Sequence, residues 1–246
     1  MARLLTGGIS LYMFATITTE AKSLHHKKTI APQNSWKKHL VDVSQIEKSK
    51  GIAYKNRIRM QLAYYSSENF VGRPIDGYKA NKCLLSLRAA QSLLKAQKSL
   101  LKKGYSLIAF DCYRPQKAVN KFVQWCQDIS DTRTKQKYYP DIASKQDLLK
   151  LEYIASKSGH SRGSTIDLGL VYLRDESLVD MGTTFDFFGE QSHTLYAGIS
   201  PQQKENRSIL LKAMESAQFM NYEKEWWHFT LRKEPYPKNY FDYDIE

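Results

Sequence analysis

The sequence predicts a single mixed α+β domain. The chain has 246 residues, enough for one large domain or two small ones, and 42% of them are hydrophobic, which can supply a full core. Helix-type and strand-type stretches follow one another without an internal repeat, a pattern typical of α+β folds. Aromatic residues make up 12% of the chain, a proportion that argues against a disordered or low-complexity protein.

The first predicted elements are a strand, a loop, a long helix and a second strand. Residues 58–65 mix apolar, polar and aromatic residues as an early strand does, and glycine and proline breakers predict a loop over residues 69–78. Apolar residues recur at helical spacing over residues 81–103, which predicts a long helix that Gly104 ends. Residues 105–110 follow as a short buried strand.

The second half adds helices and strands around a polar insertion. Pro115 suits a first helical position, so a helix is expected to begin there. The later predictions, in chain order, are a surface insertion at residues 128–147, two strands around 158–173, a turn-rich stretch at 180–200, a helix over 202–217 and an aromatic strand over 226–231.

The first 40 residues are interpreted as a leader and a linker. An arginine near the N-terminus precedes a short apolar stretch, and small residues permit cleavage after Ala21, so residues 1–21 form a candidate signal peptide. Residues 22–40 are polar and basic and predict a linker, which leaves 41–246 as the domain. We therefore expect a periplasmic or secreted protein. The alternative is a cytoplasmic protein with a disordered N-terminus, because two glycines and scattered threonines weaken the apolar stretch.

The chain is basic, and the excess charge lies near its front. Lys and Arg number 37 against 25 Asp and Glu, a net charge of +12. Residues 20–60 hold ten basic and three acidic residues, or +7 of that total. No zinc-finger spacing, basic heptad or RNA-binding signature accompanies them, so we expect no nucleic-acid partner. A solvated lead-in, or weak attraction to anionic envelope polymers, explains the charge better.

Simple counts exclude an integral membrane protein and a cysteine-rich framework. No stretch approaches the roughly 20 apolar residues of a transmembrane helix, which excludes an integral membrane protein. The three cysteines, Cys83, Cys112 and Cys126, are too few and too widely spaced for a disulfide framework or a cysteine zinc knuckle. At most one disulfide can form, and the odd number leaves the compartment undecided.

A histidine and an aspartate in one segment suggest a metal site. Gly163-Ser164 fits the centre of a two-residue type II′ turn, and in the resulting hairpin His160 and Asp167 lie directly opposite each other, with Cβ atoms about 5 Å apart. That separation suits two ligands of one tetrahedral zinc ion. The alternative is an ordinary cross-strand pair.

A second segment offers a third ligand and a carboxylate. His228 lies in an apolar strand and can supply another nitrogen, while Glu225 shares its side only if it lies in the turn that enters the strand. Three protein ligands and a carboxylate near an open fourth position are what a hydrolytic zinc needs. In the alternative interpretation the neighbouring tryptophans are core and Glu225 is a solvated charge.

Arg114 stands at the junction of a predicted strand and a predicted helix. Its guanidinium cannot lose its charge, so at such a junction it is well placed to hold an anion or a developing oxyanion. The alternative is a surface arginine beside a helix start.

Four strings occur in a fixed order along the chain. They are Asp111-Cys-Tyr-Arg-Pro115, Ser158-Gly-His-Ser-Arg-Gly-Ser-Thr-Ile-Asp167, Asp180-Met-Gly-Thr-Thr-Phe-Asp186 and Glu225-Trp-Trp-His228. In this order they resemble the D-alanyl-D-alanine dipeptidases of the vancomycin-resistance type, and residues 69–78 are similar to the segment before that family's first long helix. The resemblance covers about residues 40–235.

The resemblance implies a zinc metallopeptidase, with one Zn²⁺ per chain, on a mostly antiparallel sheet flanked by helices, similar to the D,D-carboxypeptidases and the hedgehog signalling domain. It matches His160, Asp167 and His228 to the zinc ligands, Glu225 to the catalytic base, Arg114 to the transition-state arginine and Asp186 to an acidic residue associated with the free amino group of the substrate. Cys112 and Thr165 stand where the family often has small residues, and neither change removes a ligand.

The function that the resemblance implies is hydrolysis of the small dipeptide D-Ala-D-Ala to two D-alanines. The alternative is a zinc D,D- or L,D-carboxypeptidase acting on longer peptidoglycan peptides. A non-catalytic envelope-binding protein is a third interpretation, and it predicts salt-dependent binding without zinc. No nucleophile-elbow pattern surrounds a serine, which disfavours a serine hydrolase. His193 is interpreted as a loop residue or as a support for a ligand.

Overall fold

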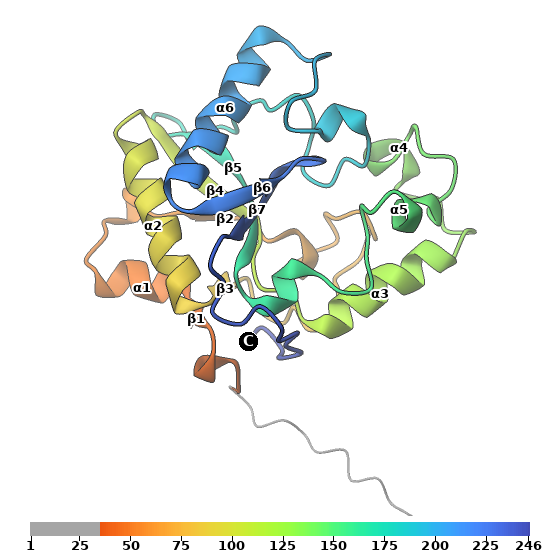
Figure 1. Cartoon of the computed structure of the whole chain (residues 1–246), viewed down its shortest axis with the longest axis horizontal. Helices are drawn as coiled ribbons and strands as arrows, with labels where there is room; N and C mark the ends of the chain where they lie inside the picture. The colour runs from red at the N-terminus through yellow and green to blue at the C-terminus, as the bar shows by residue number, and fades with distance from the viewer. Residues whose placement is uncertain (1–34) are drawn as a thin grey trace, which may run out of the picture. The chain divides into compact units, whose positions relative to one another are not determined.

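The computed structural model describes residues 35–246, and a five-stranded sheet forms the centre of this part of the chain (Figure 1). Its order is β2-β4-β5-β7-β6, and among the described strands β2–β4 is the parallel pairing of this sheet while the other three pairings are antiparallel. The strands are β2 Arg59–Met60, β4 Tyr105–Asp111, β5 Thr165–Tyr172, β6 Phe219–Tyr222 and β7 Glu225–Leu231. A second sheet pairs β1 Val41–Asp42 with β3 Leu84–Leu85. The predicted α+β class with a mostly antiparallel sheet is confirmed.

The helices flank the five-stranded sheet on two sides. Two long helices, α2 and α6, pack against each other and cover one face, while α3, α4 and α5 lie on the other side (Figure 1). Their bounds are α1 Val43–Ser49, α2 Leu87–Leu101, α3 Gln116–Gln127, α4 Lys135–Tyr138, α5 Asp147–Lys150 and α6 Pro201–Ser216. Short 3₁₀ turns are η1 Ser35–Lys38, η2 Tyr54–Asn56, η3 Ala63–Tyr65, η4 Gly159–Arg162 and η5 Glu190–Ser192. No helix in residues 35–246 is long and apolar enough to cross a membrane.

Hydrogen-bonding side chains explain where the two long helices begin. The helix predicted over 81–103 begins at Leu87, because Ser86 caps it with a bond from the Ala89 N–H and the two preceding leucines belong to β3. Helix α6 begins with a proline, and Ser200 and Gln203 form a capping box around its first turn. Both helices then bury their apolar faces against the sheet.

Several predicted elements are shorter than the sequence indicated. The strand predicted over 58–65 is reduced to β2, and η3 follows it. The pair of strands predicted around 158–173 is the single strand β5, preceded by the turn η4. Strand β6 was not predicted, because of its four residues Phe219 alone is buried and the segment carries little periodicity.

Two hydrophobic cores lie within the described domain. The first fills the space between the sheet and helices α2 and α6. The second is rich in aromatic residues and surrounds α3; it includes Tyr64, Phe70, Phe122, Trp125 and Phe188. Rings of the second core meet at centroid distances of 4.8–5.8 Å, a spacing at which aromatic pairs attract.

Two segments that the sequence assigned to the surface take part in the second core. Trp36 and Leu40, placed in the predicted linker, are 4% and 1% exposed, because their apolar side chains pack onto the domain. In the predicted insertion 128–147, Tyr138, Tyr139 and Ile142 are buried in that core as well. The candidate signal peptide 1–21 and the linker residues before Ser35 lie outside the described residues.

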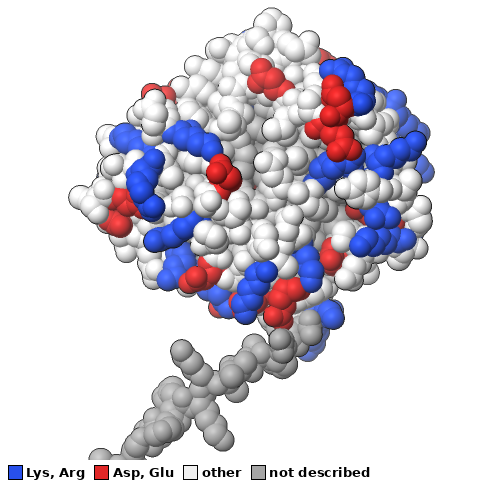
Figure 2. All heavy atoms as spheres, turned by 180° about the vertical axis from the view of Figure 1, so that it is seen from behind, with Lys and Arg blue, Asp and Glu red and all other residues white. Residues whose placement is uncertain are grey.

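Charged side chains are mixed over the surface of the described domain. On the face in Figure 2, Lys and Arg lie around the edge and are interspersed with Asp and Glu. Several of them form surface ion pairs, such as Lys117 with Asp244 and Lys137 with Glu68. Such pairs contribute little stability, but the two charges of each pair neutralise each other at short range. That no nucleic acid binds stays a prediction.

One disulfide joins Cys83 to Cys112, while Cys126 is buried and free. It links the segment before α2 to the end of β4 and closes a loop with a sequence separation of 29. Restriction of the unfolded chain by such a loop contributes about 3.5 kcal/mol. We expect the Cys83→Ala/Cys112→Ala protein to lose about that free energy of unfolding in urea titrations, and the reduced wild type to lose the same amount. Equal stability of the oxidised and reduced chains would contradict this.

Glu47 makes the stability of the fold dependent on pH. Its side chain is buried, and burial raises its pKa to about 6, even though it accepts a hydrogen bond from the Ile58 N–H at 2.9 Å. The folded chain therefore takes up this proton at a higher pH than the unfolded chain. The resulting stabilisation is complete below the unfolded pKa of about 4.5 and is lost as the pH rises through about 6.

We therefore expect Glu47→Gln to reduce the gain in stability between pH 7 and pH 4.5, because glutamine keeps the acceptor but cannot ionise. The check is urea unfolding at several pH values. Glu215→Gln, at an exposed position of α6, is the control and should follow the wild type. Parallel pH curves for Glu47→Gln and the wild type would exclude Glu47 as the source.

Candidate metal and catalytic site

Three ionisable side chains form one row across the sheet. In the strand register Asp111 of β4 faces Asp167 of β5, and Asp167 faces His228 of β7. Directly opposed residues project from the same face of a sheet with Cβ atoms about 5 Å apart. The sheet therefore brings together residues from strands that are far apart in the sequence.

His160 joins this row from a turn, so the predicted hairpin is wrong. Residues 159–162 form η4, Ser158 caps it, and Gly163 ends it in the left-handed region at φ +74° and ψ 18°, which is not a type II′ geometry. The glycine is needed there because most other residues resist positive φ. His160 still lies next to Asp167, with Nε2 3.2 Å from Oδ2, but a helical turn places it there.

The ligating atoms of His160, Asp167 and His228 lie within 4.8 Å of one another. His160 Nδ1 donates to the carbonyl oxygen of Cys112 at 2.7 Å, which leaves Nε2 free to face the other two. Nε2 is 3.4 Å from His228 Nδ1, and His228 Nδ1 is 3.0 Å from Asp167 Oδ1. Bonds of about 2.1 Å at tetrahedral angles put zinc ligands about 3.4 Å apart. The three side chains fit a zinc ion.

The protonation states of His160 and Asp167 fit a metal as well. Burial lowers the pKa of His160, so its imidazole is neutral. Burial acts to raise the pKa of Asp167, but His160 and His228 hold it below its usual range, so its carboxylate is ionised. Oδ1 of Asp167 is buried and makes no hydrogen bond. A neutral imidazole, an ionised carboxylate and an unsatisfied oxygen are the forms that bind a metal ion. Burial acts to lower the pKa of His228, but Asp167 and Glu225 raise it overall, so metal binding at this imidazole would release a proton.

Glu225 lies beside His228 inside the same cavity. Its side chain is buried, and burial raises its pKa to about 7. Its Oε2 atom is 3.4 Å from His228 Nδ1, although residues three apart on a regular strand face opposite sides. Glu225 is therefore not a solvated surface charge. A buried carboxyl group with a pKa near 7 can both accept and donate a proton.

Arg114 is held in place by two carboxylates. Its Nε donates to Asp111 at 2.9 Å, and one terminal nitrogen donates to Asp167 Oδ2 at 3.4 Å. The guanidinium also lies 5.1 Å from the ring centroids of Tyr64 and Phe122. The side chain is 13% exposed, so it is not the surface arginine of the alternative interpretation. One fixed positive charge thus contacts a residue of the candidate metal site, Asp167.

Asp186 comes from the segment between β5 and η5 and lines the same cavity. It is buried, and its Oδ2 accepts a hydrogen bond from the Tyr64 hydroxyl at 2.8 Å. Burial raises the pKa of Asp186, and the nearby Asp167 carboxylate raises it further. A cation that entered the cavity would stabilise its ionised form.

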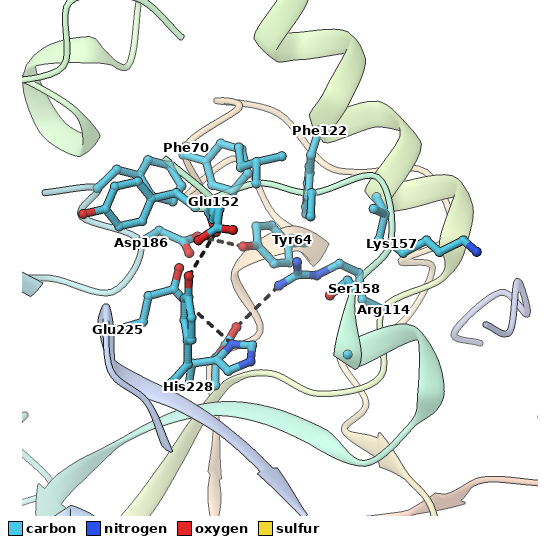
Figure 3. A pocket seen from close by; sticks show the side chains of 18 residues that line it. Tyr64, Phe70, Arg114, Phe122, Glu152, Lys157, Ser158, Asp186, Glu225 and His228 are labelled. Atoms are coloured by element: carbon cyan, nitrogen blue, oxygen red, sulfur yellow. Dashed lines mark hydrogen bonds and ion pairs between the residues drawn. The ribbon is translucent and has the colours of Figure 1, made fainter. Parts of the chain in front are cut away.

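The cavity between these groups is small, about 190 Å³. The pockets of drug-sized ligands are larger, about 300–1,000 Å³. Figure 3 shows Arg114, Asp186, Glu225 and His228 around it. Aromatic side chains complete its wall: Tyr64, Phe70, Phe122, Tyr153, Phe188 and Tyr222. Of the six predicted site residues, five line the cavity, and His160 is buried next to one of them, Asp167.

Several residues of the site had no role in the sequence interpretation. Asp111 accepts a hydrogen bond from Arg114 and lies three residues before it in the same motif. That short separation is the sequence signal that could have indicated the pair. Tyr64 belongs to a segment interpreted as a strand, and nothing in its neighbours points to Asp186. His193 lies outside the metal group: it follows η5, and its Nε2 is 3.2 Å from the Tyr153 hydroxyl.

Comparisons with known proteins agree with this geometry. The profile of the D-ala-D-ala dipeptidase family matches residues 40–246. A D-alanyl-D-alanine dipeptidase of Enterococcus faecium is 44% identical over 189 residues, which are 77% of this chain and 93% of that protein. One of Enterococcus faecalis is 43% identical over 76% of this chain and 93% of its own length, and one of Escherichia coli is 32% identical over 71% and 79%.

A crystal structure of a vancomycin-resistance D,D-pentapeptidase with Zn(II) aligns with a TM-score of 0.39 and 14% identity, over 63% of this chain and 77% of that one. The sequence relatives, rather than this alignment, therefore establish the kinship. The profile spans the whole described domain apart from its first residues, and the relatives are similar over most of their own length. The chain belongs to the D-alanyl-D-alanine dipeptidase family.

Proposed function

We propose that this protein is a zinc-dependent dipeptidase that hydrolyses D-Ala-D-Ala to two D-alanines. The observation that carries the proposal is the convergence of His160, Asp167 and His228 at a small cavity that Glu225 and Arg114 also line. A cavity of this size suits a dipeptide better than a long peptide. The names of the relatives supply the identity of the dipeptide.

Each residue has a role that its position supports. His160 Nε2, His228 Nδ1 and a carboxylate oxygen of Asp167 would hold the zinc ion, which supplies Lewis-acid chemistry that makes water more acidic and polarises a carbonyl group. Glu225 takes the proton from the attacking water and returns it to the leaving amine. Arg114 stabilises the negative charge that develops on the carbonyl oxygen, because its guanidinium is already held in place.

Asp186 is proposed to bind the ammonium group of the dipeptide. Replacing it with asparagine keeps the acceptor for Tyr64 but removes the charge. A hydrogen bond to a charged group contributes about 10- to 100-fold in affinity. We therefore expect Asp186→Asn to raise KM for D-Ala-D-Ala by about that factor with a smaller change in kcat, in steady-state assays of D-alanine release. A KM equal to that of the wild type would assign the ammonium to another group.

The test of the function is D-alanine release from D-Ala-D-Ala by the purified protein, before and after treatment with a chelator and after zinc is restored. An N-acylated tripeptide that ends in D-Ala-D-Ala is assayed in parallel. Zinc-dependent release from the free dipeptide alone is the expected result. Release from the blocked peptide would indicate a carboxypeptidase, and no release from either would indicate a non-catalytic envelope-binding protein.

We also propose that the protein is exported and acts on dipeptides from peptidoglycan. The disulfide between Cys83 and Cys112 supports export, because disulfides persist in oxidising compartments. The candidate signal peptide 1–21 supports it too. Cell fractionation with N-terminal sequencing of the mature protein is the test: recovery in the periplasm or medium with a new N-terminus after Ala21 is expected, and a full-length reduced chain in the cytoplasm would contradict export.

A further inference from the structure

The pairing of strand β7 with strand β6 breaks at the candidate site. The antiparallel register is regular up to the pair Asn221–Phe229, but the next residue of β6, Tyr222, faces Glu225. Residues 226–228 of β7 therefore have no counterpart on β6. This break is a β-bulge of three unpaired residues, and it contains the proposed ligand His228.

The bulge decides which way Glu225 points. On a regular strand Glu225 and His228 would face opposite sides of the sheet, yet their side chains are 3.4 Å apart in one cavity. Trp226 and Trp227, which lie between them, are buried in the core. The extra residues thus let the strand turn its proposed base and its proposed ligand to the same side.

The side chain of Asn221 spans the bulge. Its Nδ2 donates to the carbonyl oxygens of Glu225 and His228, at 3.0 Å each. Its Oδ1 accepts from the Thr194 hydroxyl at 2.5 Å, and the Thr194 N–H donates to the Glu223 carbonyl at 2.8 Å. Both protons and the oxygen of one amide are used, so its orientation is fixed. The bond to His228 satisfies a carbonyl that has no β6 residue opposite it, and the bond to Glu225 lies where the ladder resumes at the pair Tyr222–Glu225.

We infer that Asn221 is a positioning residue for the reaction. By binding the main chain of Glu225 and of His228, it fixes the separation between the base and the third zinc ligand. A general base that is misplaced by about 1 Å can cost about 100-fold in rate. Groups that orient metal ligands typically contribute about 10- to 100-fold in metal affinity. The inference rests on the proposed function for the roles of those two residues.

The experiment compares Asn221→Asp with the wild type as full-length protein. Aspartate has nearly the same shape but no proton to donate at neutral pH, so both carbonyl bonds are lost. We expect the apoprotein to bind Zn²⁺ about 10- to 100-fold more weakly in competition with a chromogenic chelator. The visible spectrum of the Co²⁺-substituted protein should change, and kcat should fall about 100-fold with KM little altered.

Met220→Gln is the matched control, because Met220 is the neighbouring residue on β6 and is 44% exposed. It should leave zinc affinity, the Co²⁺ spectrum and kcat unchanged. If Asn221→Asp lowers only the melting temperature and leaves these three properties intact in the folded protein, Asn221 is merely structural and the inference is overturned. Zinc affinity and the Co²⁺ spectrum need no substrate, so they test Asn221 even if D-Ala-D-Ala is not hydrolysed.

Thr194→Val is the second variant, for use if Asn221→Asp does not fold. It removes the hydroxyl that donates to Asn221 Oδ1 but keeps both carbonyl bonds. We expect a smaller loss of zinc affinity, below about tenfold, which corresponds to one neutral hydrogen bond. Zinc affinity and a Co²⁺ spectrum identical to those of the wild type would overturn the inference by this route.

Discussion

Glu225→Gln is expected to lower kcat for D-Ala-D-Ala by about 10²- to 10⁴-fold, the usual contribution of a general base. Glutamine has nearly the same shape and cannot take a proton from water. Zinc content should stay at one ion per chain, because Glu225 is not one of the three converging ligands. The check is steady-state turnover together with metal analysis of the same preparation.

Glu223→Gln is the control for this variant. Glu223 lies two residues earlier on the exposed turn between β6 and β7, and its side chain does not line the cavity. Its turnover should match the wild type. Near-normal hydrolysis by Glu225→Gln would assign the proton transfer to another group, and loss of zinc from Glu225→Gln would show that the carboxylate supports the metal instead.

Arg114→Lys is expected to lower kcat by about 10²- to 10³-fold, as removal of one oxyanion donor does elsewhere. Lysine keeps the charge but cannot bond Asp111 and Asp167 at once from a planar group. Asp111 is completely buried, and the ion pair with Arg114 stabilises its charge there. Weakening that pair should therefore also lower the free energy of unfolding. The measurement is kcat per folded, zinc-loaded molecule, with the melting temperature recorded in parallel.

Arg162→Lys separates the two effects. Arg162 pairs with Glu234 at 2.7 Å, is largely buried and does not line the cavity. It should lose some stability while its kcat stays close to that of the wild type. If Arg114→Lys behaves in the same way, Arg114 is a structural ion pair and does not stabilise the transition state.

The short motifs of this sequence correctly indicate which residues meet at the site. The local pattern around them does not predict the backbone geometry that brings them together. His160 and Asp167 are neighbours as expected, but through the turn η4 and not through a hairpin. Gly163 correctly indicated a tight turn. Its left-handed conformation arises because it ends the turn η4, which the sequence did not predict. Helices 87–101, 116–127 and 201–216 were predictable because their start signals are local: a capping serine precedes the first and third, and Pro115 precedes the second.

The remaining features depend on tertiary contacts that no local pattern encodes. Glu225 and His228 share a side because β7 bulges between them, and Asn221 of the neighbouring strand spans that bulge. Tyr64 meets Asp186 across 122 residues of sequence. Trp36 and Leu40 looked like parts of a linker because their neighbours are basic, and their burial follows from the aromatic core that receives them.

The row formed by Asp111, Asp167 and His228 has a consequence for the order in which the protein is assembled. His228 reaches the other ligands only through the pairing of β7 with β5, and β7 lies near the end of the chain. Within residues 35–246 the group of three converging side chains is complete only with β7, so a metal ion would bind there after this strand has docked. A one-residue slip of that strand would turn His228 to the opposite face. Binding of the proposed ion would therefore depend on the C-terminal strand having paired with β5 in its native register.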